Sequence, residues 1–351
     1  MIYFNSDYTE GTHEQILQAL VRTNMEQTPG YGTDRFCQEA VTAIRRYCRG
    51  NPDVHFMVGG TQTNLTVIAA SLRPHQCVVC AEMGHINVHE TGAIEACGHK
   101  IMTIPSSDGK ITAKQVERLV QGHKDDATHE HMAQPKVVYI TNATEMGEVY
   151  TRKELESMRE VCNRHNLILY MDGARLGYAL GSHRNDLDLA LLSELCDVFS
   201  IGGTKMGTMF GEAVVISHPG VRLDFRYIMK QKGALLAKGR LLGIQFLEMF
   251  DNGLYFELGK QADVLAQMLK EGLLKFGHSV PIDGGTNQVF AIMPNAVIEA
   301  LEEKYVFEFI RRANESHSMI RMCTSWATKE SDVQDLIDNI QIMTSLHGGK
   351  D

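Results

Sequence analysis

The 351-residue chain has 44% hydrophobic and 22% charged residues, an ordinary globular composition with length enough for one large core and a smaller domain. Its formal charge of −9 argues against a nucleic-acid partner, and no apolar run approaches the roughly 20 residues of a membrane span. The eight cysteines lie mostly in apolar runs, and the N-terminus lacks a signal-peptide pattern, so we expect reduced thiols and a cytoplasmic protein.

The N-terminal part of the sequence predicts a polar segment followed by two helices. Residues 1–12 are mostly polar and contain Ser6, and apolar residues recur at helical spacing over residues 13–26. A Pro/Gly-rich turn then carries Tyr31, and a second helix runs through about Arg49. Tyr31 is expected to be an exposed aromatic side chain on a rigid turn.

A glycine-containing motif predicts an anion-binding site. A short strand at residues 55–58 runs into GGTQTN at 59–64, and a helical pattern follows at 65–72. The glycines let a ligand approach the backbone, and the unpaired N–H groups of the first helical turn favour negative charge. Gly60 and Thr61 are therefore candidate phosphate-binding residues.

The next elements bring a histidine to the end of a strand. Residues 76–81 form a predicted strand that closes shortly before His85, a candidate for stacking on a flat ring.

The polar segment 122–135 holds three histidines without an apolar scaffold, which favours a surface loop over a metal site, and no metal is expected. A strand at 137–140 and a helix at 150–165, with Thr151 as N-cap, follow.

Two charged side chains close successive strands. An apolar strand ends at Asp172, a helical pattern spans 187–195, and a second apolar strand at 198–201 leads into glycines and Lys205. A right-handed crossover makes these strands parallel, so both side chains emerge at the carboxyl edge of one sheet. A lysine facing an aspartate there suits pyridoxal phosphate, because the lysine forms the Schiff base and the carboxylate keeps the pyridine nitrogen protonated.

The remaining sequence predicts the end of a large domain and a smaller C-terminal one. A strand at 212–217 and a basic helix at 222–242 complete the large domain, residues 1–250, whose site includes the N-terminal segment 1–12. The small domain, residues 251–351, is predicted to be α+β, with a long helix at 256–276, strands near 288–293 and 320–324, and a closing helix at 331–346.

Several motifs occur in a familiar order along nearly the whole chain: Ser6-Asp7, GGTQTN at 59–64, His85, MDGAR at 171–175, Lys205, and IRMCTSWAT at 320–328. With them the sequence resembles the threonine aldolase branch of the aspartate aminotransferase superfamily, the fold type I pyridoxal phosphate enzymes. The resemblance implies a large α/β domain with a mainly parallel seven-stranded sheet. It also implies an aldehyde-lyase that cleaves an L-β-hydroxy-α-amino acid, such as threonine or allo-threonine, to glycine and an aldehyde.

The resemblance also implies a role for each matching residue. Lys205 would form the Schiff base, Asp172 would pair with the pyridine nitrogen, and His85 would stack on the ring. The remaining cofactor contacts would come from Gly60, Thr61, Thr204 and Arg175. The substrate carboxylate would be bound by Ser6, Arg175 and Arg321, because a guanidinium pairs with a carboxylate through two bonds.

Members of this family are similar dimers or dimer-based tetramers with sites shared between subunits. Tyr31 and the basic segment 230–238 would therefore approach the cofactor or substrate of the neighbouring subunit. Where relatives have an arginine for the phosphate, this segment has only lysines.

One position departs from the family pattern. Many threonine aldolases have a second histidine in the loop after the strand that ends near Asn142, and this sequence has Thr144 there. The base for the β-hydroxyl group is therefore open. His85 acting through a water is the first candidate, and Glu90 and Glu145 are alternatives. A substrate with another side chain, such as an aromatic one, fits as well as threonine.

Two other classes of function stay open. The same cofactor residues would serve a β-eliminating lyase or an amino acid racemase, because the bond cleaved depends on which one lies perpendicular to the ring. A non-catalytic binding protein could keep the fold, although Lys205, Asp172, Arg175 and Arg321 are all present.

Overall fold

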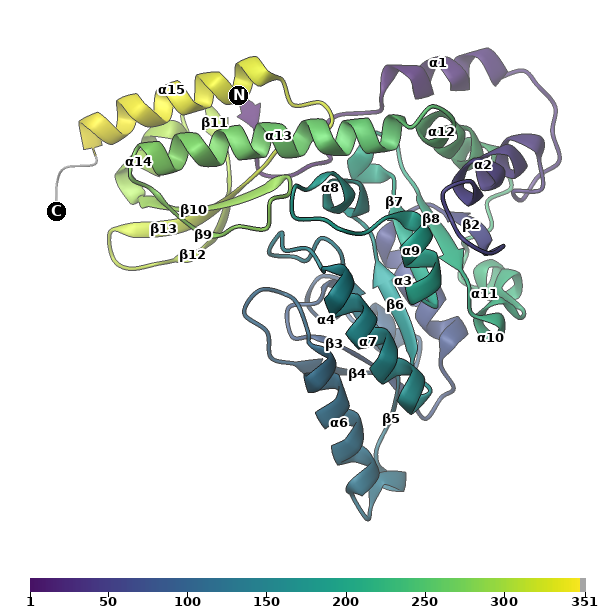
Figure 1. Cartoon of the computed structure of the whole chain (residues 1–351). Coiled ribbons are helices and arrows are strands. Elements are labelled where there is room, and N and C mark those ends of the chain that lie inside the picture. Colours follow the sequence, from purple (N-terminus) through teal and green to yellow (C-terminus); the bar gives the residue numbers. More distant parts are fainter. Residues whose placement is uncertain (348–351) are drawn as a thin grey trace.

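The computed structural model describes residues 1–347 and is built around a seven-stranded sheet (Figure 1). Only β8 runs in the opposite direction to the other six strands, so the sheet is mainly parallel, as predicted. The strands in spatial order are β2 (Asp53–Met57), β8 (Glu212–Ile216), β7 (Val198–Gly202), β6 (Ile168–Asp172), β5 (Gln134–Thr141), β3 (Gln76–Ala81) and β4 (Lys100–Ile104).

Helices cover both faces of this sheet, because nearly every strand is apolar on both sides. One face packs against α2 (Arg35–Arg45), α6 (Ala113–Asp125), α7 (Arg152–His165), α8 (Leu176–Gly181), α9 (Leu189–Leu195) and α12 (Arg240–Asp251). The other packs against α3 (Gly60–Ser71), α4 (His85–Val88), α5 (Ala93–Ala96), α10 (Pro219–Arg222) and α11 (Phe225–Gln231). Helix α1 (Glu14–Thr23) lies on α12.

The C-terminal elements form a second layered unit beside the large sheet (Figure 1). Its antiparallel sheet has the order β12 (Glu308–Arg312), β13 (His317–Cys323), β10 (Gln288–Pro294) and β9 (Ser279–Ile282). The helices are α13 (Leu254–Lys275), α14 (Asn295–Leu301) and α15 (Glu330–His347). The first strand of the chain, β1 (Ile2–Tyr3), pairs with β11 (Tyr305–Val306) of this unit. The proposed boundary at residues 250 and 251 stays a prediction.

Local sequence signals explain several of the helix starts. Thr151 caps α7, and the side chain of Glu154 bonds back to the Thr151 backbone, which completes a capping box.

The predicted single helix over 222–242 is wrong, because the chain forms α11 and then α12. Gly233 between them has a φ of +72°, in the left-handed region that ends a helix. Within residues 1–347, none of the helices combines the length and apolarity needed to cross a membrane.

Candidate active site

A cavity of about 330 Å³ opens at the edge of the large sheet where its parallel strands end. Strands β6 and β7 are parallel neighbours, as predicted, and the chain after each contributes to the lining. Asp172 ends β6, and Lys205 lies in the 3₁₀ turn Thr204–Met206 that follows β7. Predicted residues in the lining are Gly60, Thr61, His85, Asp172, Arg175, Thr204 and Lys205.

Asp172 is held in place by three hydrogen-bond donors. Its Oδ2 accepts bonds from Asn64 Nδ2 at 2.9 Å and from the Tyr139 hydroxyl at 2.7 Å. Its Oδ1 accepts a bond from the Ala174 backbone N–H at 2.9 Å. The carboxyl is buried at the sheet edge. It is thus pre-oriented to receive a positively charged ring nitrogen.

His85 and Asp172 are connected through two buried side chains. His85 Nδ1 lies 2.8 Å from Glu90 Oε1, and that oxygen also accepts a bond from Asn64 Nδ2 at 2.7 Å. The same Asn64 amide bonds Asp172, and the Tyr170 hydroxyl donates to Asn64 Oδ1 at 2.6 Å. The Glu90 side chain is fully buried, whereas that of His85 is 37% exposed. His85 therefore keeps one nitrogen on Glu90 and its other nitrogen free for a ligand.

Lys205 is surrounded by charged groups inside the cavity. Burial lowers the pKa of its amine, and the nearby Arg175 guanidinium lowers it further, while Asp7, Glu212 and Asp172 oppose this effect. The turn that carries Lys205 is closed by Thr204, whose Oγ1 accepts a bond from the Gly211 N–H at 3.0 Å. A lysine with a lowered pKa reaches its nucleophilic, uncharged form more readily.

The N-terminus of α3 opens on the same cavity. Helix α3 begins at Gly60, and the preceding Gly59 is extended and gives it no side-chain cap. The first-turn N–H groups of Gly60 and Thr61 are therefore left for a ligand. This twelve-residue helix directs its positive end toward the cavity that holds Lys205.

Arg175 lines the cavity but is already paired. Its Nε and Nη2 donate to the two carboxylate oxygens of Asp7 at 2.7 and 3.0 Å. Asn287 Nδ2 donates to Asp7 at 2.9 Å, so the pair is buried and satisfied. Burial raises the pKa of Asp7, but Arg175 and Lys205 outweigh burial and hold that pKa below its ordinary value. The N-terminal segment thus reaches the site through Asp7.

Replacing Asp7 with asparagine is expected to destabilise the fold strongly. The change leaves the Arg175 guanidinium buried without its counter-ion, which costs about 3–5 kcal/mol of unfolding free energy. Urea denaturation measures this loss, and Glu39→Gln, which removes half of an exposed ion pair, is the control.

Because of the same ion pair, the stability of the fold should decrease at acidic pH. Because folding lowers the pKa of Asp7, its stabilisation is present above the unfolded pKa and is lost as the pH falls below about 4. Equal unfolding midpoints for Asp7→Asn and the control would contradict this account.

Ser6 and Arg321 lie outside the set of residues that line the cavity. Ser6 is buried, and Tyr8, two residues later, lines the cavity instead. Arg321 on β13 forms an ion pair with Glu308, donates to Gln288 Oε1 at 3.0 Å, and contacts the Asn5 carbonyl. Both substrate-binding roles stay predictions.

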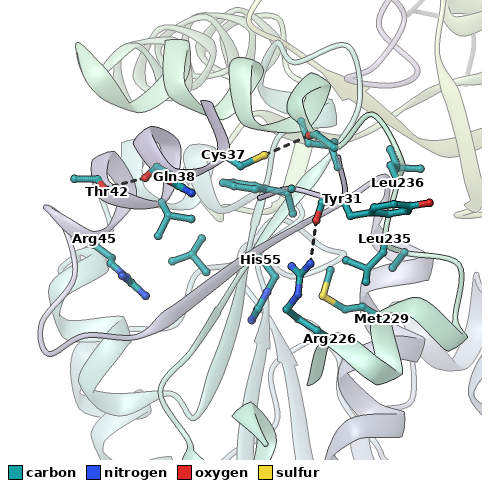
Figure 2. Close-up of a pocket in the computed structure, with 17 residues that line it drawn as sticks. Tyr31, Cys37, Gln38, Thr42, Arg45, His55, Arg226, Met229, Leu235 and Leu236 are labelled. Carbon is teal, nitrogen blue, oxygen red and sulfur yellow. Dashed lines mark hydrogen bonds between the residues drawn. The ribbon is translucent and has the colours of Figure 1, made fainter. Parts of the chain in front are cut away.

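Tyr31 lies in a different pocket of the same chain, of about 260 Å³ (Figure 2). Its φ of +58° is left-handed, and its carbonyl accepts a bond from Arg226 Nη2 at 3.0 Å. Lys230 Nζ lies 4.6 Å from the centre of the Tyr31 ring, and 46% of the residue is exposed. The predicted turn is thus exposed and braced by the basic segment.

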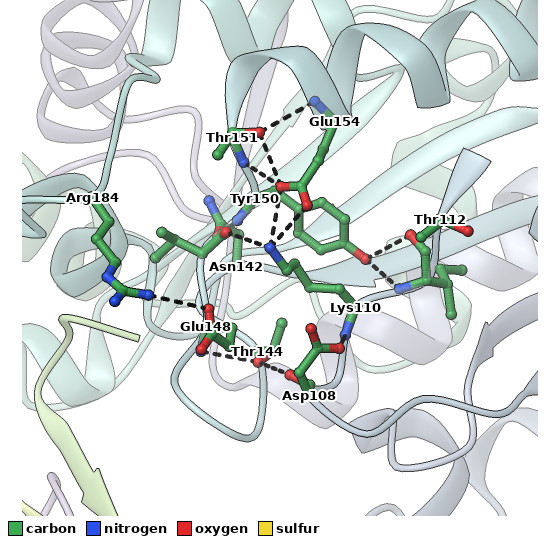
Figure 3. Close-up of polar contacts among 12 residues, drawn as sticks. Asp108, Lys110, Thr112, Asn142, Thr144, Glu148, Tyr150, Thr151, Glu154 and Arg184 are labelled. Carbon is green, nitrogen blue, oxygen red and sulfur yellow. Dashed lines mark hydrogen bonds and ion pairs between the residues drawn. The ribbon is translucent and has the colours of Figure 1, made fainter. Parts of the chain in front are cut away.

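Thr144 is a structural residue in the loop after β5 (Figure 3). Its hydroxyl donates to the Asp108 carbonyl at 2.8 Å and accepts from the Glu148 N–H at 3.2 Å, and the residue is fully buried. Glu145 lines the cavity, but its oxygens accept bonds from the His85 N–H and the Thr141 hydroxyl. Burial raises the pKa of Glu145. Neither side chain is as free as His85 to receive a proton.

Comparison with known proteins decides the family. Residues 4–322 match the family described as "Beta-eliminating lyase". The chain belongs to this family of beta-eliminating lyases. It is 29% identical to the low specificity L-threonine aldolase of Pseudomonas sp. over 350 residues, which cover 97% of this chain and 98% of that protein.

Solved structures refine the family assignment. A Leishmania major threonine aldolase superposes with a TM-score of 0.94 and 42% sequence identity, covering 99% of both chains. This places the chain in the threonine aldolase branch. A Thermus thermophilus aspartate aminotransferase is 14% identical with a TM-score of 0.70, covers 97% of this chain and 96% of its own, and shows the shared fold type I architecture.

The cavity of this chain fits pyridoxal phosphate. It offers an amine, a carboxylate and a helix N-terminus, which match the aldehyde, the pyridine nitrogen and the phosphate of that cofactor. Sequence reasoning missed Asn64 and Glu212. Asn64 ends the GGTQTN motif at 59–64, at the position one turn along α3 that faces the sheet. Glu212 begins an apolar strand and carried no recognisable signal.

Proposed function

We propose that the protein is a pyridoxal 5′-phosphate-dependent aldehyde-lyase that cleaves L-threonine or a related L-β-hydroxy-α-amino acid to glycine and an aldehyde. The observation that carries the proposal is the cavity in which Lys205, Asp172 and the His85–Glu90 pair meet at the end of α3. Relatives that cover nearly the whole chain carry the name threonine aldolase, two of them low specificity L-threonine aldolase, which supports the same reaction.

The cofactor supplies an electron sink that stabilises the carbanion left when a bond to Cα breaks. In the proposed site Lys205 attaches the cofactor, and the Asp172 carboxylate, fixed by Asn64 and Tyr139, stabilises the charge on the ring nitrogen. The first-turn N–H groups of α3 at Gly60 and Thr61 hold the phosphate, together with Thr204.

We assign the base for the β-hydroxyl group to His85. With its Nδ1 on the Glu90 carboxylate, Nε2 is the nitrogen left to accept a proton, directly or through a water. Glu90 acts as a positioning residue, since its buried carboxylate fixes the tautomer of the ring. The hydroxyl of Thr144 is engaged with backbone groups and is not required.

The substrate carboxylate is proposed to bind near Arg175, Arg321 and Ser6. The Arg175 guanidinium already donates two hydrogen bonds to Asp7. It therefore attracts the substrate carboxylate through its positive charge and not through a free pair of N–H donors. Arg321 is paired with Glu308, whose side chain is 43% exposed, and we propose that the substrate carboxylate replaces Glu308.

The proposed assembly is a dimer or tetramer in which Tyr31 and the basic segment 230–238 approach the neighbour's site. The support is the exposed Tyr31 ring, held by Lys230 on a left-handed turn. A cytoplasmic location is likewise proposed, because the eight cysteines of residues 1–347 are free thiols.

A product assay tests the proposed reaction. Purified protein supplied with the cofactor is expected to release acetaldehyde and glycine from L-threonine. The second candidate, β-elimination, is favoured by the family description and would instead release ammonia and a 2-oxo acid from L-serine or L-threonine. Ammonia without aldehyde would overturn the aldolase proposal in favour of elimination.

Replacing His85 with phenylalanine is expected to separate binding from catalysis. A flat ring remains over the cofactor, but the base is lost, so kcat for L-threonine should fall by about a hundredfold or more. The dissociation constant of glycine, which has no β-hydroxyl group, should change little. Full threonine cleavage by His85→Phe would move the base to another residue.

Replacing Glu90 with glutamine tests the positioning role. The amide can donate to His85 Nδ1, which leaves the proton on Nε2, so kcat should fall about tenfold or more while the glycine affinity holds. Glu90→Asp, which keeps a carboxylate, should recover part of the loss. Equal losses in both variants would mean that Glu90 only supports the fold.

A further inference from the structure

Glu212 is a buried acidic residue inside the cofactor cavity, and the proposed chemistry leaves it without a role. It is the first residue of β8 and pairs with Gly202 of β7 on one side and Met57 of β2 on the other. Only 4% of it is exposed, and it lines the cavity together with Lys205. A charged group in such a place needs a partner or a task.

The side chain of Glu212 lies on the face of the sheet that α3 covers. Along β8, Ala213 and Val215 pack in the core of one face, while Val214 and Ile216 pack in the core that includes α3. Strand alternation places Glu212 with Val214 and Ile216. Glu212 also pairs with Met57, which ends β2 three residues before α3 begins at Gly60, so the start of β8 lies next to the N-terminal end of α3.

Nothing within residues 1–347 pairs with the Glu212 carboxyl through a hydrogen bond or an ion pair. The charged and titratable groups around it are Asp172 and Tyr170 of β6, Lys205 after β7, and Tyr255 of α13. Burial raises the pKa of Glu212 well above its usual value, Asp172 raises it further, and Lys205 opposes both. Burial and Asp172 thus favour the uncharged form of this carboxyl, which has a proton to donate.

An uncharged acid at this point suits a phosphate ester. A carboxylate would repel the phosphate that α3 attracts, whereas a carboxylic acid can donate a hydrogen bond to a phosphate oxygen. We propose that Glu212 is a cofactor-binding residue that donates a hydrogen bond to the phosphate as an uncharged acid. This inference rests on the proposed cofactor and adds a phosphate contact where the sequence has no arginine for it.

The proposal predicts that phosphate affinity falls when Glu212 ionises. Raising the pH through its pKa converts the donor into a negative charge, so the holoprotein should lose the cofactor more readily in alkaline solution. Glutamine has nearly the same shape and a permanent N–H donor, so Glu212→Gln should bind the phosphate without this alkaline loss. Alanine has neither donor nor charge.

The test measures binding of pyridoxamine 5′-phosphate, which has the ring and phosphate but cannot bond covalently to Lys205. Titration calorimetry from about pH 6 to about pH 9 compares wild type, Glu212→Gln and Glu212→Ala. Near neutral pH the glutamine variant should bind within about threefold of wild type, and the alanine variant about tenfold or more weaker. At alkaline pH the ratio of wild-type to glutamine dissociation constants should rise.

Pyridoxamine without the phosphate is the control ligand, and its affinity should be the same for wild type and Glu212→Gln at every pH. Thermal unfolding checks that both variants are folded. A glutamine variant that binds tenfold more weakly at neutral pH would overturn the proposal, because it would show that a carboxylate is needed beside Lys205. A constant ratio across the pH range would overturn it too. Failure of the wild type to bind the ligand at all would overturn the cofactor assignment itself.

Discussion

Replacing Lys205 with alanine is expected to remove the absorbance band of bound cofactor at the edge of the visible range. Threonine cleavage should fall by about a thousandfold or more, because the covalent attachment point is lost. Burial and Arg175 lower the pKa of the Lys205 amine, which favours its uncharged, nucleophilic form. An exposed lysine is protonated near neutral pH and therefore does not substitute for it. Absorbance spectra and aldehyde release measure the two effects.

Two further variants make the Lys205 result specific. Lys205→Arg keeps a positive charge without a nucleophile and should lose the band as completely as alanine does. Lys136→Ala is the matched control, because burial also lowers the pKa of Lys136, which lies on β5 outside the cavity lining. Persistence of the band in Lys205→Ala after dialysis would place the attachment elsewhere.

Replacing Asp172 with asparagine is expected to give the second largest loss. Asparagine cannot balance the charge on the ring nitrogen, so kcat should fall by about a hundredfold to a thousandfold. It also has one acceptor oxygen where Asp172 uses two, so the bonds from Asn64, Tyr139 and Ala174 cannot all persist. The cofactor should bind more weakly and absorb at a changed wavelength.

Asp197→Asn is the control for the loss of a hydrogen-bonded carboxylate outside the cavity; the Asp197 side chain is 16% exposed. Asp197 accepts bonds from Arg159 and the Leu169 N–H just before β7, so this change should lower stability and leave the cofactor spectrum unaltered. An unchanged spectrum and rate in Asp172→Asn would contradict the role of Asp172.

The parts of the fold that were predictable depend on short-range patterns. Apolar runs that end in Asp172 and near Lys205 identify two parallel strands, and the handedness of crossovers brings their ends together. The break between α11 and α12 was not predictable from the apolar and basic residues around it. It depends on the backbone at Gly233, and a glycine inside a helical pattern can also be tolerated.

The candidate site was predictable where a residue type implies its chemistry. The sequence indicates Lys205, Asp172 and His85 because each ends a strand or follows one closely. It does not reveal that Arg175 pairs with Asp7, since the two residues are 168 positions apart and either could have faced a ligand. Asn64 and Glu212 depend on which face of a helix or strand meets the cavity, which only tertiary packing decides.

The N-terminal segment depends on parts of the chain that are made last. Strand β1 pairs with Tyr305–Val306, and Asp7 accepts a bond from Asn287, 280 residues further along. At typical ribosomal speeds the wait between these two residues is roughly 14 to 56 s. Until then the segment that carries Asp7, the counter-ion of Arg175, lacks both of these contacts. The placement of Asp7 and Tyr8 at the cavity is therefore expected to be complete only near the end of synthesis.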